Sequence, residues 1–144
     1  MIHEVQTEAE MLKLGEELAA TLHSGDIVLL SGELGAGKTT LTKGIAQGLR
    51  ILEDITSPTF TLMNTYPVSA ESDVKTLVHI DTYRLKNQEE LLEIGVEDYL
   101  GKPTTLCIIE WPEKIEGLLK NKKTIAITIE HTKNHTRTLT IERA

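Results

Sequence analysis

The sequence predicts an α/β domain with a mainly parallel central sheet and a C-terminal β-hairpin. Two observations support this fold class. Short all-apolar runs, typical of strands buried on both faces, alternate with helical patterns, and the last strands alternate threonine with aliphatic residues around a polar turn. The chain has 144 residues, the length of one domain with one hydrophobic core. We therefore expect residues 1–144 to form a single domain.

Helices are predicted in three parts of the chain. Apolar residues recur at helical spacing over Glu8–Leu22, after Thr7, which has a glutamate three residues later and so forms a capping-box pattern. A second helix is expected over Lys38–Leu49. The acidic segment Asn87–Leu100 is predicted to be partly helical, with a break at Gly95.

Strands are expected wherever four or five mostly apolar residues follow one another, or alternate with polar ones. The segments that fit are Ile27–Leu30, Phe60–Tyr66, Thr76–Ile80 and Leu106–Ile109. Parallel, buried strands are the simplest interpretation of these runs. Segments 124–129 and 138–141 are expected to pair as the C-terminal hairpin.

The composition describes an acidic domain with few aromatic side chains. Its 15 Lys+Arg against 22 Asp+Glu give a net charge of −7, which argues against a free-standing nucleic-acid surface. No apolar run approaches the roughly 20 residues that span a bilayer, and no segment resembles a signal peptide. A cytoplasmic protein without a membrane partner is expected. The single cysteine, Cys107, lies in an apolar run and is expected to be a small core residue.

Residues 32–39 carry the strongest functional signal. They read Gly-Glu-Leu-Gly-Ala-Gly-Lys-Thr, a full match to the P-loop pattern, between an apolar strand and a helical pattern. This context predicts a three-layer P-loop NTPase fold whose glycines allow backbone N–H groups to face phosphate oxygens. Lys38 is expected to contact the β- and γ-phosphates, and the Thr39 hydroxyl to ligate Mg²⁺. The expected ATP-binding residues of this segment are Gly35, Ala36, Gly37, Lys38, Thr39 and Thr40. A glycine-rich turn without a ligand is the alternative.

Two acidic residues that follow apolar strands are the candidates for catalysis. Leu106–Ile109 followed by Glu110 has the form of a Walker B strand, which predicts that Glu110 coordinates Mg²⁺ through water. Asp81 is expected to hold a Mg²⁺-bound water or to orient the attacking water. A solvated carboxylate at a strand end is the alternative for each. His79, on the same strand face as Asp81, is predicted to be a packed, hydrogen-bonded histidine.

Two further features leave alternatives open. The segment Ser57–Thr59 follows the P-loop helix at the distance where many P-loop proteins carry a nucleotide-sensing loop. A simple turn into the next strand explains it equally well. Trp111 either packs over the site or marks a contact surface.

Four segments then coincide in one short chain: the P-loop, Thr-Ser-Pro-Thr-Phe-Thr-Leu from Thr56, His-Ile-Asp-Thr-Tyr-Arg-Leu from His79, and Ile-Glu-Trp-Pro-Glu from Ile109. Together they resemble the TsaE (YjeE) family over essentially the whole chain. The resemblance implies a bacterial ATPase that hydrolyses ATP slowly and is required for threonylcarbamoyladenosine in tRNA. It also implies assembly with the TsaD and TsaB proteins, with tRNA contacted only indirectly.

The resemblance carries over to particular positions. The residues that match the family's nucleotide and Mg²⁺ positions are Lys38, Thr39, Asp81 and Glu110. Ser57–Thr59 matches a switch-like loop, and Trp111 a residue next to the site. Thr7 matches an N-terminal residue near the nucleotide base. Glu33 stands where aspartate is frequent in the family, at a variable position of the loop.

Two other classes of P-loop protein compete with this interpretation. Small-molecule kinases usually place several arginines over the transferring phosphate, and here only Arg84 lies beside a candidate site motif. GTP switches usually select guanine with an Asn-Lys-x-Asp segment, whereas residues 121–124 read Asn-Lys-Lys-Thr. We favour the tRNA-modification ATPase. Because no arginine-rich lid is evident, we expect slow hydrolysis until a partner completes the site.

Overall fold

The computed structural model describes residues 1–33, 35–56, 58, 62–68, 71–132 and 135–143. In this part of the chain a seven-stranded sheet has the order β1-β7-β6-β2-β5-β4-β3. The strands are β1 (Ile2–Val5), β2 (Ile27–Gly32), β3 (Met63–Pro67), β4 (Thr76–Asp81), β5 (Thr105–Glu110), β6 (Ile125–His131) and β7 (Arg137–Arg143). The helices are α1 (Glu8–Ala19), α2 (Lys38–Gly48), α3 (Glu89–Glu93) and α4 (Glu116–Leu119), with short 3₁₀ segments at Val96–Asp98 and Pro112–Ile115.

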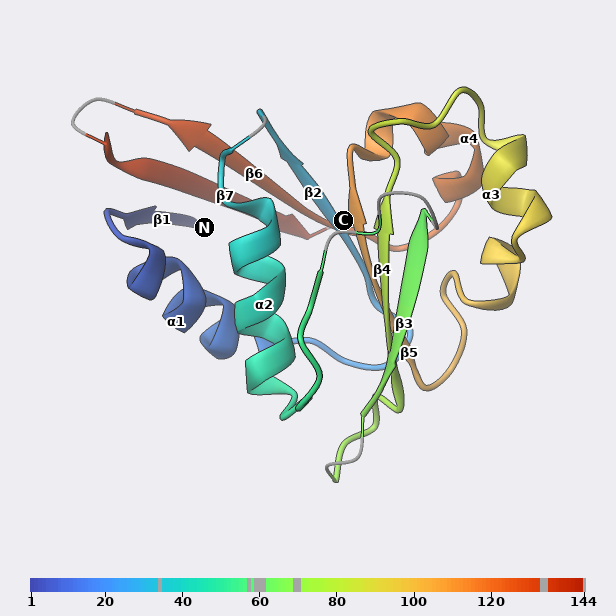
Figure 1. The fold of residues 1–144 in the computed structure, drawn as a ribbon, viewed down its shortest axis with the longest axis horizontal. Coiled ribbons are helices and arrows are strands. Elements are labelled where there is room, and N and C mark those ends of the chain that lie inside the picture. The colour runs from blue at the N-terminus through green and yellow to red at the C-terminus, as the bar shows by residue number, and fades with distance from the viewer. Residues whose placement is uncertain (34, 57, 59–61, 69–70, 133–134, 144) are drawn as a thin grey trace.

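Helices cover both faces of the sheet. Figure 1 shows α1 and α2 on one face, and α3 and α4 on the other. Each face has its own aliphatic cluster, one containing Leu30, Leu41 and Ile45, the other Ile80 and Ile109. The predicted α/β fold in three layers is confirmed. Among the described residues, no helix is long and apolar enough to cross a membrane.

The centre of the sheet is parallel and its edges are antiparallel. Strands β6, β2, β5 and β4 pair in parallel, and β6 and β7 form the predicted C-terminal hairpin. The expectation of a parallel strand over Phe60–Tyr66 is wrong, because β3 runs antiparallel to β4. Only residues 68–75 connect them, whereas a parallel crossover needs about a dozen residues or more. Residues 59–61 lie outside the described part.

Strand β1 has no counterpart in the sequence expectations. It pairs antiparallel with β7, and its residues are mostly exposed, with Val5 buried. Four residues with polar His3 and Glu4 in the middle give no strand signal of their own. The edge of β7 supplies the hydrogen bonds that define the strand.

The helices match the sequence expectations closely. Thr7 caps α1, and its hydroxyl accepts the backbone N–H of Glu10 at 3.1 Å. The helix ends at Ala19, before the expected Leu22, because the chain turns there and Thr21 donates its hydroxyl to the Leu18 carbonyl. The predicted break at Gly95 is confirmed.

Helices α1 and α2 pack with almost no separation at one crossing. A Cβ atom built on Gly44 would lie 2.4 Å from the carbonyl oxygen of Leu12, and one on Gly15 would lie 2.6 Å from that of Leu41. The two glycines therefore allow the helix backbones to touch. This contact fixes α2, which begins at the end of the P-loop, against the rest of the domain.

Candidate nucleotide site

The P-loop joins β2 to α2 at the carboxyl ends of the parallel strands. Gly35 and Gly37 have φ angles of 79° and 108°, in the left-handed region that favours glycine. A Cβ on Gly37 would also lie 3.0 Å from Met11 and 3.1 Å from the Arg137 guanidinium. The backbone at the start of α2 can therefore turn sharply only because Gly37 has no side chain.

A cavity of about 550 Å³ opens beside this loop. The sequence-predicted residues that line it are Thr7, Gly35, Gly37, Lys38, Thr39, Thr40, Asp81 and Glu110, together with Trp111. Ala36 does not line it, because its side chain is buried and its N–H donates to the Glu33 carbonyl at 3.0 Å. Ser57 and Thr59 lie outside the described residues, so the sensing-loop expectation stays a prediction. The fold thus gathers these lining residues from four separate parts of the sequence around one space.

Lys38 begins α2, and its side chain lies along the P-loop. Its ammonium donates hydrogen bonds to the carbonyl oxygens of Gly32 and Glu33, and it lies 3.9 Å from the centre of the Trp111 ring. Burial lowers the pKa of Lys38 from its ordinary value, and nearby carboxylates, Glu110 first, oppose that shift. Lys38 is therefore a largely buried cation held by neutral groups that a phosphate can replace.

Glu110 ends β5 and is almost completely buried, with 3% of its surface exposed. Its Oε2 lies 2.6 Å from Nε2 of His79, which is fully buried on β4. The prediction of a packed, hydrogen-bonded His79 is confirmed, and its partner is the candidate Mg²⁺ ligand. The alternative of a solvated carboxylate at Glu110 is wrong, because the side chain is enclosed by protein.

Asp81 ends β4 and is the direct register partner of Glu110 on β5. Its Oδ1 accepts the backbone N–H of Tyr83 at 2.9 Å, which fixes the carboxylate at the strand end. Burial raises the pKa of Asp81, the charge of Glu110 acts in the same direction, and the Tyr83 N–H opposes both. Two carboxylates of neighbouring strands therefore face one end of the cavity, as expected from their positions in the sequence.

Trp111 packs over the site, as one of the two sequence-based alternatives has it, and the contact-surface alternative stays a prediction. Its backbone adopts a left-handed conformation with φ 61°, and Thr82 donates its hydroxyl to the Trp111 carbonyl. The ring contacts Lys38 on one side and lies 5.1 Å from the centre of the Tyr83 ring. An uncommon backbone conformation for a large residue is thus used to bring the indole beside the lysine.

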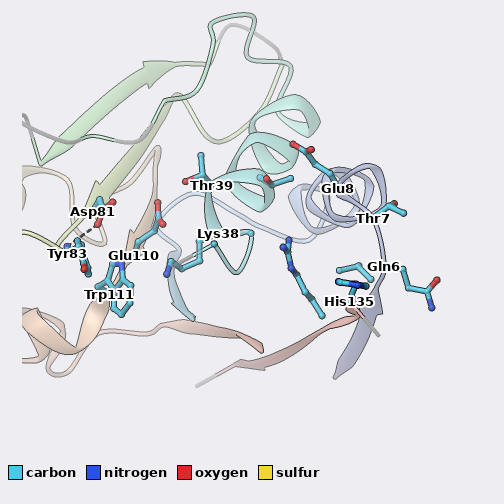
Figure 2. A pocket seen from close by; sticks show the side chains of 15 residues that line it. Gln6, Thr7, Glu8, Lys38, Thr39, Asp81, Tyr83, Glu110, Trp111 and His135 are labelled. Carbon is cyan, nitrogen blue, oxygen red and sulfur yellow. Dashed lines mark hydrogen bonds between the residues drawn. The ribbon is translucent and has the colours of Figure 1, made fainter. Parts of the chain in front are cut away.

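The cavity has two chemically different ends. Figure 2 shows Asp81, Glu110 and Trp111 at one end, with Lys38 and Thr39 in the middle. At the other end are Thr7 and His135, together with Gln6 and Glu8 (Figure 2). The Thr7 hydroxyl also donates to Oε2 of Glu10 at 3.3 Å, so its main role in this structure is to cap α1.

Arg137 and His135 also line the cavity, and no sequence pattern predicted this. Arg137 is the first residue of β7, and it pairs with Val5 of β1. Because β1 has no strand signal, its pairing with β7 was not predictable from local patterns. The spacing of the hairpin places Arg137 near its tip, but nothing in that spacing indicates that the tip reaches Gly37.

The donors at this cavity fit Mg²⁺ bound together with a nucleotide. Among the described residues, no three His, Cys, Asp or Glu side chains are arranged to hold a metal ion. Mg²⁺ does not require such a cluster, because it keeps several waters and is usually held by one or two protein oxygens plus substrate phosphates. The Thr39 hydroxyl and the Glu110 carboxylate are oxygen donors of this kind.

Comparisons with known proteins point to one family. The model of the family described as "Threonylcarbamoyl adenosine biosynthesis protein TsaE" matches residues 5–139. The chain is 39% identical over 120 residues to the tRNA threonylcarbamoyladenosine biosynthesis protein TsaE of Haemophilus influenzae, covering 80% of this chain and 73% of that protein. It is 40% identical over 141 residues to the TsaE protein of Rickettsia conorii, covering 97% and 77%.

A solved structure supports the same relationship. The crystal structure of YdiB from Bacillus subtilis superposes with a TM-score of 0.79 at 29% sequence identity, covering 98% of this chain and 83% of that one. The likeness therefore covers nearly the whole of this chain.

Proposed function

This chain belongs to the TsaE family, whose members act in tRNA threonylcarbamoyladenosine biosynthesis, and from that premise we propose that it is a Mg²⁺-dependent ATPase with low activity of its own. We propose that it acts with TsaD and TsaB in forming the threonylcarbamoyl group on adenosine of tRNA. The observation that carries the proposal is the shared cavity of a complete P-loop and two strand-end carboxylates. Lys38, Asp81 and Glu110 line that one space.

The two ends of the cavity suggest how ATP lies in it. The triphosphate belongs beside Lys38 and the start of α2, where a cation and the positive end of a helix dipole coincide. The adenosine then extends toward Thr7 and His135, at the end away from the carboxylates. Lys38 would exchange its bonds to the Gly32 and Glu33 carbonyls for bonds to phosphate oxygens, and Thr40, which lines the same cavity, would help to hold the phosphates.

The carboxylates are proposed to serve the reaction rather than to bind the nucleotide. Mg²⁺, when bound, neutralises charge on the β- and γ-phosphate oxygens. Thr39 would ligate it directly and Glu110 through water. Asp81, held by the Tyr83 N–H, faces the same end and would orient a water for attack on the γ-phosphate.

Low activity follows from what the site supplies. Phosphoryl transfer needs positive charge around the γ-phosphate and exclusion of bulk water. Among the described residues that line the cavity, the lysine and arginine side chains are Lys38 and Arg137, and Arg137 lies against Gly37 at the start of α2. The end of the cavity that holds Asp81 and Glu110 therefore lacks a second cation from the described residues, which a partner protein could supply.

The net charge of −7 supports an indirect role toward tRNA, because phosphate backbones are held by clustered positive charge. TsaD and TsaB would then contact the tRNA, and this chain would act on it through them. A role in tRNA modification supports the cytoplasm as its compartment.

Steady-state ATP hydrolysis tests the proposal. The chain alone should turn over far below the roughly 10 s⁻¹ median of enzymes, and adding TsaD with TsaB should raise the rate. Fast hydrolysis by the isolated chain, unchanged by those proteins, would contradict it. Thermal shifts with ATP, ADP and GTP separate the alternatives, because a GTP switch would be stabilised most by GTP.

A further inference from the structure

We propose that His79 is a positioning residue of the Mg²⁺ site, which fixes the Glu110 carboxylate in its metal-binding orientation and keeps it away from Lys38. The inference rests on the proposed function, because it concerns the same site. Three observations carry it: a buried hydrogen bond between His79 and Glu110, an unpartnered ring nitrogen of His79, and the position of the P-loop cation Lys38.

The hydrogen bond joins two side chains that are almost wholly enclosed. The Nε2 atom of His79 lies 2.6 Å from Oε2 of Glu110, and the side chains are 0% and 4% exposed. His79 is paired with Ile108 across β4 and β5, so Glu110 lies diagonally one step further toward the strand ends. One carboxylate oxygen is therefore held by His79, while Glu110 is also one of the residues that line the cavity.

The second ring nitrogen shows which way the bond points. Nδ1 of His79 is buried and has no hydrogen-bond partner among the described residues. A hydrogen on Nδ1 would be a buried donor without an acceptor. Burying an unpaired donor costs free energy, whereas an exposed donor can bond to water. A carboxylate only accepts hydrogen bonds, so the hydrogen of the neutral imidazole lies on Nε2, which donates to Glu110, and Nδ1 is left as a buried acceptor. His79 is thus a donor to Glu110.

The position of Lys38 explains why the hydrogen bond from His79 matters for the site. The Lys38 side chain lines the same cavity as Glu110, and Figure 2 shows the two side chains as neighbours there. Yet the described residues show no ion pair between them: Lys38 donates to the carbonyls of Gly32 and Glu33, and Glu110 bonds to His79. Without the imidazole, the carboxylate could turn toward Lys38 and neutralise the charge that the phosphates need. Hydrogen bonds of this kind orient metal ligands in many proteins.

Two variants of His79 separate the effect of the hydrogen bond from the effect of the side-chain volume. His79→Gln keeps an N–H donor near the position of Nε2, whereas His79→Leu keeps a similar volume and removes the donor. Val78→Ala serves as a control, because Val78 is fully buried on the same strand and belongs to the other hydrophobic cluster. It should lower stability without touching Glu110.

The readout is the Mg²⁺ concentration that half-saturates binding of a non-hydrolysable ATP analogue, measured by calorimetry on folded protein. His79→Leu should raise this concentration about ten-fold or more, as is typical when a group supporting a metal ligand is lost. In His79→Gln the half-saturating Mg²⁺ concentration should stay within about three-fold of the wild-type value, because the donor to Glu110 is kept. Val78→Ala should leave the concentration unchanged.

Three results would overturn the inference. An unchanged Mg²⁺ requirement in His79→Leu would show that the histidine only packs, and equal losses in the glutamine and leucine variants would show that the donor is not what matters. A wild-type chain that binds the analogue equally well with Mg²⁺ and with a chelator would contradict the proposed function itself. If His79→Leu does not fold, His79→Asn, whose amide is too short to reach Oε2, takes its place with the same expected loss.

Discussion

Asp81 and Glu110 stand directly opposite each other at the ends of neighbouring parallel strands. They are nonetheless held differently: Glu110 bonds to the buried His79, and Asp81 accepts a backbone N–H from Tyr83. Glu110 is enclosed, whereas Asp81 is partly exposed. The two carboxylates can therefore take different parts in one reaction, a metal ligand and a group that orients water.

The first prediction concerns these two residues. Glu110→Ala and Asp81→Ala should each retain ADP binding and lose most ATP hydrolysis, because neither side chain is proposed to hold the nucleotide itself. Binding is measured by calorimetry and turnover by phosphate release in the presence of TsaD and TsaB. Glu113→Ala is a suitable control, since this acidic residue is close enough to affect Lys38 and does not line the cavity. Normal turnover in both site variants would mean that the Mg²⁺ site lies elsewhere.

The second prediction concerns the contact between α1 and α2. Gly44→Ala should lower the free energy of unfolding by about 1–3 kcal/mol, because the new methyl group would overlap the Leu12 carbonyl. An exposed helical glycine behaves in the opposite way and gains roughly 1 kcal/mol when replaced by alanine. Urea denaturation measures the change. Gln47→Ala, at an exposed position of the same helix, should stay within about 0.5 kcal/mol of wild type. A stabilised Gly44→Ala variant would contradict the close packing.

The third prediction concerns Cys107. The thiol is fully buried in β5, and burial raises its pKa to about 12. A raised thiol pKa means that the reactive thiolate is scarce below that pH, so the folded protein should not react with a thiol reagent at pH 8. The same protein in urea should react completely. Rapid labelling of the folded chain would show that β5 opens readily or that the sulfur is accessible.

Much of the site could be predicted because its signals are local. The P-loop is one continuous segment, and Asp81 and Glu110 each end an apolar run, so the rule that parallel strands end at one sheet edge brings them together. The bond between His79 and Glu110 depends instead on the register of β4 against β5, which no local pattern gives.

The missed elements share one physical origin. Strand β1 exists because β7 offers it hydrogen bonds, and β3 is antiparallel because its connection to β4 is short. Arg137 reaches the cavity through the same edge pairing. Edge strands take their structure from the strand they pair with, β1 from the distant β7 and β3 from the nearby β4, whereas buried central strands carry their own apolar signal.

Loss of the P-loop cation tests the central claim, that ATP phosphates bind at Lys38, most directly. Lys38→Ala removes the ammonium and leaves Gly37 and the backbone turn in place, and Lys43→Ala, at an exposed position of the same helix, removes an equal charge away from the cavity. Titration calorimetry with Mg²⁺ and ATP should show affinity at least about ten-fold weaker for Lys38→Ala, which corresponds to about 1.4 kcal/mol, and near wild type for Lys43→Ala. Equal ATP affinity in a folded Lys38→Ala variant would contradict the account.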